Sequence, residues 1–338
     1  MESRFERMQF GENCMKRGLV VGKFWPPHRG HQFLIETARS QCEQLYVMLC
    51  QRPHEVPRAE LRIAWLRELY PDVQFYLVDD TMGDDDPKGW AHNTKRVLGF
   101  APDVVFTSEN YGESFAHFLA CHHICVDKSR KTVPISGTRV REKPLQNWEF
   151  LSEPVRGFYA KRVVLIGAES TGKTTLATQL ADHFETNWVA EYGREYCEQK
   201  FERNLNETWA SREFVHIAQT QYEREDLAAR ECNRVLVCDT DAFATGVWHE
   251  RYLGFASPEI ETLVQNHRAP DLYLLADVNT PFVQDGTRDG EAIRGWMHAR
   301  FVEKTTQQNR KCVFLQGSFE ERFLQAINSI DDILQNDK

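Results

Sequence analysis

Long hydrophobic runs are missing from this sequence of 338 residues. No run approaches the ~20 apolar residues that a membrane-spanning helix needs, and the first residues lack the apolar centre of a signal peptide. Internal repeats and low-complexity segments are also missing. These absences exclude a membrane-spanning protein, and we expect a cytoplasmic protein with no membrane partner.

Regular cysteine spacing is also missing. The nine cysteines are scattered and odd in number, which favours reduced thiols over a disulfide framework. The stretch CHHIC at 121–125 suggests zinc, but no second ligand pair follows at metal-site spacing. We therefore expect a helix that runs into a strand here, with Cys125 buried.

Positive charge is in deficit, since 41 Lys and Arg face 50 Asp and Glu and give a net charge of −9. This balance argues against broad nucleic-acid binding, and we expect no nucleic-acid partner. Local basic clusters can still bind the phosphates of a small molecule. With 41% hydrophobic residues, the chain is long enough for two domains that each have a core.

Both halves of the chain alternate short apolar runs with helix-like periodicity. In the first half we expect strands at 19–22, 45–50, 73–78, 104–107 and 124–126, and helices at 30–42, 59–70, 90–98 and 113–121. In the second half we expect strands at 163–166, 235–238, 272–275 and 312–315, and helices at 172–184, 212–229, 259–266, 291–308 and 319–334. Such alternation predicts an α/β fold, with parallel sheets covered by helices on both faces.

The pattern weakens at 145–159, where Pro154 and Gly157 interrupt it. We therefore expect one domain at 1–150 and another at 158–338. Residues 81–89, TMGDDDPKG, combine acidic charge with strong breakers and are expected to form a loop.

The first chemical motif is GKFWPPHRGH at residues 22–31, directly after an expected strand. Its two prolines restrict the turn, and Gly30 permits a close backbone approach. His28 and His31 are three residues apart and can face the same side of a first helical turn. Two imidazoles at a helix N-terminus make a donor cluster suited to a polyphosphate.

A second element, ISGTRVR at residues 135–141, complements the first. Ser136 or Thr138 can cap a helix that starts there. Arg139 and Arg141 follow in its first turns, where they suit the other side of a triphosphate.

Together, the two elements resemble the nucleotidyltransferase superfamily, and within it the nicotinamide-mononucleotide adenylyltransferases of the NadR type. The resemblance covers about residues 17–141. It implies a Rossmann-like parallel sheet and direct attack of a mononucleotide phosphate on the α-phosphorus of ATP, with Mg²⁺ bridging phosphates. It assigns His28, His31 and Arg141 to the ATP phosphates. The other motif positions counted as ATP-binding are Gly22, Lys23, Phe24, Ser136 and Thr138.

The same family stacks a nicotinamide ring on an aromatic side chain. Trp90, with Asn93 nearby, is the candidate here, although a half-buried core tryptophan is an equal interpretation. Arg52, just after the expected strand at 45–50, is a candidate for the mononucleotide phosphate, and a solvated loop arginine is the equal alternative.

The second motif, GAESTGKT at residues 167–174, matches the P-loop pattern at every fixed position. Lys173 is expected to reach the β- and γ-phosphates of ATP, and Thr174 to bind Mg²⁺. Asp239, at the end of the apolar run VLVCD, is the expected partner acid for the metal. The remaining candidate ATP contacts are Gly167, Ser170, Thr171, Gly172 and Thr175.

Several features favour a small-molecule kinase over a motor or a switch GTPase. No Asn-Lys-x-Asp guanine signature is present. Residues 285–290, DGTRDG, are expected to form a lid that carries Arg288 to the transferring phosphate, with a solvated loop as the alternative. Glu191 and Tyr192 are candidates for acceptor binding, with a plain amphipathic helix start as an equal alternative.

Residues 161–334 are similar to the ribosylnicotinamide kinase domain of the NadR family, and the order of the domains also matches. Only about seventeen residues precede the first strand, too few for the helix-turn-helix domain of the family's repressors. We expect no repressor function.

The leading hypothesis is a bifunctional enzyme of NAD salvage that uses nicotinamide riboside, the mononucleotide NMN, ATP and Mg²⁺; homo-oligomerisation is left open. The alternatives are the same reactions on another nucleoside or a pantetheine-like acceptor, and a non-enzymatic nucleotide sensor.

Overall fold

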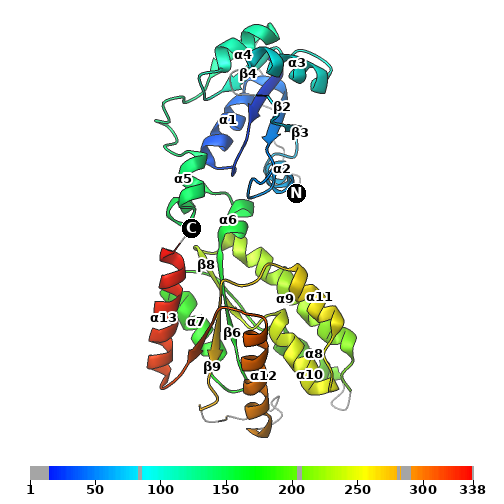
Figure 1. Ribbon diagram of the computed structural model, residues 1–338, viewed down its shortest axis with the longest axis vertical. Coiled ribbons are helices and arrows are strands. Elements are labelled where there is room, and N and C mark those ends of the chain that lie inside the picture. The colour runs from blue at the N-terminus through cyan, green and yellow to red at the C-terminus, as the bar shows by residue number, and fades with distance from the viewer. Residues whose placement is uncertain (1–14, 83–85, 204–207, 280–281, 283–290, 337–338) are drawn as a thin grey trace, which may run out of the picture. The chain divides into compact units, whose positions relative to one another are not determined.

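The computed structural model describes residues 15–82, 86–203, 208–279, 282 and 291–336. The chain divides into two compact units, Met1–Val155 and Arg156–Lys338 (Figure 1). Within the part that is described, no helix has the length and apolar character to cross a membrane.

The first unit is built on a five-stranded sheet in the order β3-β2-β1-β4-β5, and all its neighbouring strands are parallel. The strands are β1 (Met15–Gly22), β2 (Cys42–Gln51), β3 (Gln74–Asp79), β4 (Val104–Thr107) and β5 (His122–Cys125). The helices are α1 (Arg29–Arg39), α2 (Ala59–Leu69), α3 (Pro87–Leu98), α4 (Gly112–Leu119), α5 (Gly137–Glu142) and the 3₁₀ helix η1 (Leu145–Phe150). Helix α6 (Glu153–Tyr159) spans the boundary between the two units.

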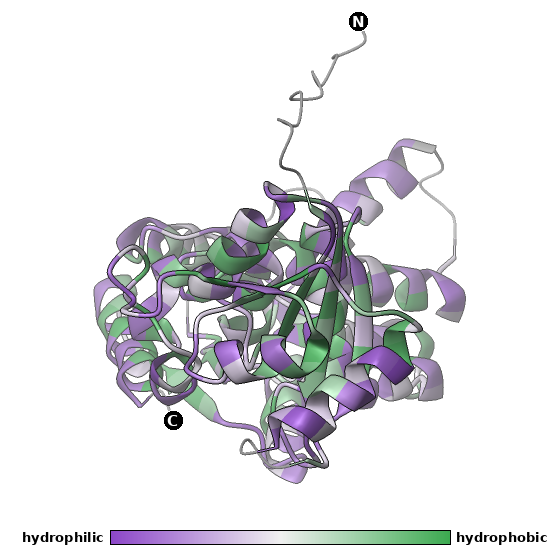
Figure 2. Ribbon diagram, turned by 90° about the horizontal axis from the view of Figure 1, so that it is seen from above, coloured by the Kyte–Doolittle hydropathy of each residue, from purple (hydrophilic) through white to green (hydrophobic). Residues whose placement is uncertain are grey.

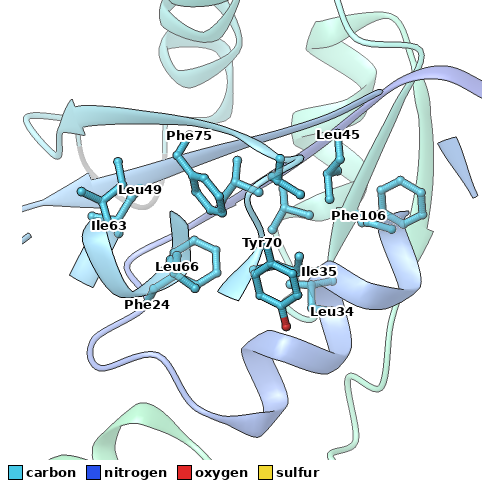
Figure 3. Close-up of a cluster of buried hydrophobic side chains, with 14 of the residues drawn as sticks. Phe24, Leu34, Ile35, Leu45, Leu49, Ile63, Leu66, Tyr70, Phe75 and Phe106 are labelled. Atoms are coloured by element: carbon cyan, nitrogen blue, oxygen red, sulfur yellow. The ribbon is translucent and has the colours of Figure 1, made fainter. Parts of the chain in front are cut away.

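Alternating strand residues divide the core of this unit between the two faces of the sheet. On one face, Leu49 and Phe106 pack with Ile35 of α1 and Leu66 of α2 (Figure 3). On the other face, residues such as Met48 pack against α3 and α4. Helices on both faces are what the alternating pattern predicted.

The second unit has a separate five-stranded parallel sheet in the order β10-β9-β6-β8-β7. The strands are β6 (Lys161–Ile166), β7 (Trp188–Val189), β8 (Val235–Asp239), β9 (Leu272–Ala276) and β10 (Cys312–Leu315). The helices are α7 (Lys173–His183), α8 (Tyr192–Arg203), α9 (Ser211–Glu231), α10 (Ala242–Leu253), α11 (Pro258–Asn266), the 3₁₀ helix η2 (Glu291–Ile293), α12 (Arg294–Gln307) and α13 (Phe319–Gln335).

Helices cover both faces of the second sheet as well. Leu180 of α7 and Ile330 of α13 pack with Val163 and Leu274 of the sheet on one face. The helices α9 to α12 lie on the other face (Figure 1). In Figure 2 the strands are coloured mainly as hydrophobic, whereas the helices show hydrophilic segments. Because the buried clusters on each sheet contain residues of one unit only, each unit has its own core.

The sequence did not predict α10, whereas α8, which begins at Tyr192, agrees with the helix start that was one of two interpretations there. Helix α10 is buried around much of its circumference, including Phe243, Val247 and His249, so its sequence lacks the one-sided apolar stripe that marks a surface helix. The expectation for Cys125 was wrong: this side chain is exposed, because β5 is the edge strand of its sheet. The expected loop at 81–89 also ends earlier than predicted, because α3 begins at Pro87 with Asp86 as its N-cap.

Two candidate nucleotide sites

The first site lies where β1 leads into α1. His28 caps the helix, and its Nδ1 accepts a hydrogen bond of 3.1 Å from the backbone N–H of Gly30. His31 follows in the first turn, and the two imidazole rings stack with centroids 3.8 Å apart. Phe24 packs beside His31 at a ring distance of 5.0 Å. The structure thus brings the two histidines together, with His28 as the cap rather than inside the helix.

Both imidazoles lie in a buried setting that favours their neutral form. Burial, and next the charge of Arg130, lowers the pKa of His28 to about 3. Burial, and next His28 itself, holds the pKa of His31 well below its usual range. Because the Nδ1 of His28 accepts a hydrogen bond, its proton is on Nε2 and can be donated to a phosphate oxygen. The pair therefore provides neutral donors.

The second motif meets the first at the start of α5. Of the two expected cap candidates, Ser136 caps this helix, and its hydroxyl accepts from the backbone N–H of Arg139 at 3.3 Å. Arg141 donates to the backbone carbonyl of Trp25 at 2.6 Å, and its guanidinium lies 4.0 Å from the centre of the indole ring. Arg141 also donates to the hydroxyl of Thr138 at 3.0 Å.

A glycine is required at this junction. A Cβ on Gly137 would lie 2.7 Å from the carbonyl oxygen of Trp25, which is closer than real Cβ contacts allow. The glycine between Ser136 and Thr138 thus lets two motifs that are far apart in the sequence come into contact.

A cavity of about 980 Å³ opens between the two motifs, at the upper end of the range for small-molecule sites. All eight candidate ATP-binding residues of this unit line it: Gly22, Lys23, Phe24, His28, His31, Ser136, Thr138 and Arg141. The motif residues therefore share one hollow that can hold a nucleotide.

The three candidate mononucleotide contacts have different positions. Trp90 lines the cavity and also packs against the core between α3 and the sheet. Its position is therefore compatible both with stacking on a ligand and with a half-buried core tryptophan. The side-chain oxygen of Asn93 accepts from Arg96 at 2.7 Å. Arg52 forms an ion pair of 2.5 Å with Asp80. Neither Asn93 nor Arg52 is among the residues that line the cavity.

Asp80 is a cavity residue that sequence reasoning missed. It follows β3 directly, and its side chain is only 1% exposed although it lines the cavity. Its carboxylate faces Lys23 at 3.3 Å as well as Arg52. The available signal was its position after a strand, since the carboxyl ends of parallel strands form one edge of the sheet and commonly hold ligands.

Arg130 is the second cavity residue that was missed. It lies in a turn organised by Asp127, whose carboxylate accepts from the backbone N–H groups of Lys131, Thr132 and Val133 at 2.9 to 3.2 Å. Arg130 forms an exposed ion pair of 3.1 Å with Glu109. Its charge contributes to the lowered pKa of both histidines.

The second site is the turn between β6 and α7. Gly167 and Gly172 have φ values of 142° and 80°, which favour glycine, and Ser170 has a φ of 57°. Thr171 is buried and donates to the carbonyl of Ala168 at 2.9 Å. The Lys173 ammonium donates to the same carbonyl at 2.8 Å. Strand, turn and helix thus have the arrangement that the P-loop pattern requires.

Asp239 ends β8 beside this turn, and the hydroxyl of Thr174 donates to its carboxylate. The other carboxylate oxygen of Asp239 is buried and has no hydrogen-bond partner among the described residues. A hydroxyl and a carboxylate oxygen that has no hydrogen-bond partner are oxygen ligands that suit Mg²⁺. No group of three His, Cys, Asp or Glu side chains suits a metal within the described ranges. Phosphate and water oxygens would therefore complete the coordination shell.

Glu191 interacts electrostatically with charged residues of the P-loop site. Burial, and next the charge of Asp239, raises the pKa of Glu191 to about 7, while Lys173 acts in the opposite direction. Tyr192 starts α8, and its backbone N–H donates to Gln221 at 2.9 Å. The Tyr192 hydroxyl lies 3.3 Å from Nε2 of His216. Glu191 is thus the stronger candidate to reach a substrate.

The remaining predicted residues of this site are less informative. Thr175 lies exposed in the first turn of α7. Arg288 and the expected lid at 285–290 lie outside the described residues.

Two arginines near the P-loop were not predicted. Arg251 of α10 forms an ion pair of 2.9 Å with Glu169 of the loop, and both side chains are nearly buried. Arg322 of α13 is buried and donates to the carbonyl of Thr171 at 2.8 Å. Both arginines come from helices far along the chain, so no local pattern marks them.

The fold and the two sites define a nucleotidyltransferase-like unit followed by a P-loop unit. Family comparisons agree: residues 19–143 match the cytidylyltransferase-like family, and residues 162–322 match an AAA domain family. The chain is 28% identical over 358 residues to the trifunctional NAD biosynthesis/regulator protein NadR of Escherichia coli K12. This match covers 98% of the chain and 86% of that relative. The same protein of Salmonella typhimurium LT2 is 27% identical over the same shares.

Solved structures show the same fold. A NadR crystal structure in complex with NR has a TM-score of 0.78 at 21% identity, and it covers 94% of this chain and 96% of its own. A NadR structure with NAD and AMP-PNP has a TM-score of 0.75 at 20% identity, with the same coverage. Over nearly its whole length the chain is similar to the NadR proteins, in agreement with the resemblance carried by the two motifs.

Proposed function

We propose that this chain is a bifunctional enzyme that makes NAD from nicotinamide riboside in two steps. The C-terminal unit phosphorylates nicotinamide riboside with ATP, and the N-terminal unit transfers an adenylyl group from ATP to the resulting NMN. The main support is that each unit carries its own candidate phosphate-binding motif, at the carboxyl end of its own parallel sheet, in a chain similar to proteins named for NAD biosynthesis.

In the kinase step, the γ-phosphoryl group passes from ATP to a hydroxyl of the riboside, and ADP leaves. Lys173 neutralises charge on the β- and γ-phosphates, while Thr174 and Asp239 would hold Mg²⁺, which screens the phosphates. Glu191, with a pKa raised to about 7, accepts the hydroxyl proton, because a base near the working pH is effective in that role. Arg288 is proposed to approach the transferring phosphate.

In the adenylyl step, the phosphate of NMN attacks the α-phosphorus of ATP, and pyrophosphate leaves. This nucleophile is already ionised at neutral pH, so no general base is required. His28 and His31 donate hydrogen bonds to phosphate oxygens, and Arg141 and Arg130, which line the same cavity, supply positive charge. Catalysis therefore depends on positioning and on electrostatic stabilisation.

Trp90 is the proposed stacking partner of the nicotinamide ring, because it is the NMN-contact candidate that lines the cavity. Arg52 can reach the NMN phosphate only if it leaves Asp80, to which it is paired at 2.5 Å. Asn93 is retained as a weaker candidate, since it lies one helical turn after Trp90. A cytoplasmic location, homo-oligomerisation and the absence of nucleic-acid binding stay predictions.

Mass spectrometry of the products tests this function. The protein is incubated with ATP, Mg²⁺ and nicotinamide riboside, and we expect the mass of NMN to appear first and that of NAD later. Parallel incubations with other nucleosides and with a pantetheine phosphate test the alternative acceptors. If only an alternative acceptor gains mass, the assigned substrate is wrong. If none does, the sensor hypothesis is favoured.

A further inference from the structure

A second cavity lies within the C-terminal unit, away from the P-loop. It has a volume of about 600 Å³ and is lined in part by Pro270 and Lys311. Pro270 lies two residues before β9 and Lys311 directly before β10, whereas the P-loop follows the carboxyl end of β6. Because β9 pairs in parallel with both β6 and β10, the amino ends of β9 and β10 lie at the opposite edge of the sheet from the P-loop. The two sites are therefore separate.

Arg310 is held in a fixed position on the wall of this cavity. Its guanidinium lies 4.6 Å from the ring centre of Phe243 and 5.4 Å from that of Tyr273. It donates to the Tyr273 hydroxyl at 3.0 Å and to the side-chain oxygen of Gln308 at 2.7 Å. A guanidinium held between rings and hydrogen bonds loses little further entropy when it binds an anion.

Positive charge exceeds negative charge along this lining. Lys304 is neutralised by Glu250 and lies 3.8 Å from Glu261. Neither Arg310 nor Lys311 has an ion pair with a carboxylate in the portion of the chain that is described. The nearby carboxylate of Asp241 accepts a hydrogen bond of 2.7 Å from the Tyr273 hydroxyl. That hydroxyl is the group to which Arg310 donates, so it links Arg310 to Asp241. Two cations therefore face the cavity without a direct counter-ion.

The rest of the wall is mixed: polar residues such as Glu261 and Gln265 line it together with an apolar part. Phe243, Ile260, Val264 and Pro270 contribute to the apolar part, and the cavity volume falls within the range of small-molecule sites. An arginine and a lysine beside an apolar part of the wall suit a ligand that joins a phosphate to a ring. We propose that this cavity is a second ligand site of the C-terminal unit, which binds a small organic phosphate such as a nucleoside monophosphate. The proposal does not depend on the reactions assigned to the chain.

Binding of adenosine 5′-monophosphate (AMP) by the full chain tests the proposal, with calorimetry as the measurement. All variants carry Lys173→Ala, so that binding at the P-loop contributes little. We expect Lys311→Glu to weaken one AMP site at least tenfold, and Arg310→Gln to remove it. Lys311 is exposed, so its charge reversal is not expected to disturb folding.

Arg212→Glu is the matched control, because Arg212 is an exposed cation of the same unit outside the cavity. It should leave every AMP site unchanged. The proposal is overturned if the parent binds no AMP, or if Lys311→Glu and Arg212→Glu bind AMP alike. Lys311→Glu made with Lys173 intact should phosphorylate nicotinamide riboside at the parental rate. A failure of the assigned kinase reaction would thus be seen separately from a failure of this site.

Discussion

His28 and His31 illustrate how burial determines what a side chain can do. Both lie where ATP phosphates are expected, yet their lowered pKa values keep them uncharged at neutral pH. Positive charge comes instead from Arg141 and Arg130, which line the same cavity. The first site thus separates hydrogen-bond donation from charge neutralisation.

Replacing both histidines with alanine should block the adenylyl step alone. One lost donor to a developing anion typically costs ~3–4 kcal/mol, so NAD formation should fall by at least about a hundredfold. Fed with nicotinamide riboside and ATP, the double variant should accumulate NMN, as measured by chromatography. NAD production at the parental rate would mean that the histidine pair has a structural role.

Glu191 should make the kinase step dependent on pH. Its carboxyl must be ionised to accept a proton, and its pKa is raised to about 7. The rate of NMN formation should therefore rise with pH up to about 7, level off above it, and decline as the pH falls below it. Glu191→Gln should lose kinase activity and retain adenylyl transfer from supplied NMN. A parental rate that is flat down to pH 5.5 would contradict this role.

The same pKa shift affects stability with a definite sign. The unfolded carboxyl ionises near 4.5, whereas the folded one holds its proton until about 7. Between these values the folded state binds more protons, so the free energy of unfolding falls as the pH rises.

At the scale of elements, buried ion pairs connect the loops of the sites to helices. Arg62 of α2 is fully buried and binds both the Glu55 carboxylate and the backbone carbonyl of Lys23. It therefore holds the loop that carries the first motif. Arg251 and Arg322 support the P-loop in a similar way.

Replacing Arg62 with methionine should destabilise the N-terminal unit by about 3–5 kcal/mol, because Glu55 would remain buried without its partner. The urea concentration at which half of the adenylyl transfer activity is lost should fall. The urea concentration at which half of the kinase activity is lost should not change. Arg39→Met is the control, since Arg39 forms an exposed pair of 2.7 Å with Asp72 and should cost at most about 1 kcal/mol. Equal midpoints for the two variants would contradict this account.

These elements also show what the sequence could predict. Local patterns predicted the P-loop, the end of β8 at Asp239 and a cap of α5 at Ser136 or Thr138, because each is specified by neighbouring residues. Asp80 and Arg322 have no such pattern: their roles arise only when strands and helices distant in the sequence meet. Helix α10 was missed for a related reason, since burial around its circumference removes the one-sided stripe.

At the scale of the whole molecule, the account requires two sites that work in succession. Each unit has its own sheet and core, and each phosphate motif contacts residues of its own unit. A change at one triphosphate site should therefore leave the other reaction intact. This independence is the central claim.

The Lys173→Ala variant tests it most directly, because this lysine neutralises charge at only one of the two triphosphates. The measurement is NAD formation from ATP and Mg²⁺ with either nicotinamide riboside or NMN as the second substrate. We predict that the variant makes almost no NAD from the riboside and makes NAD from NMN at the parental rate. Equal loss of NAD formation from both substrates, in a variant that is still folded, would contradict the assignment of two separate sites.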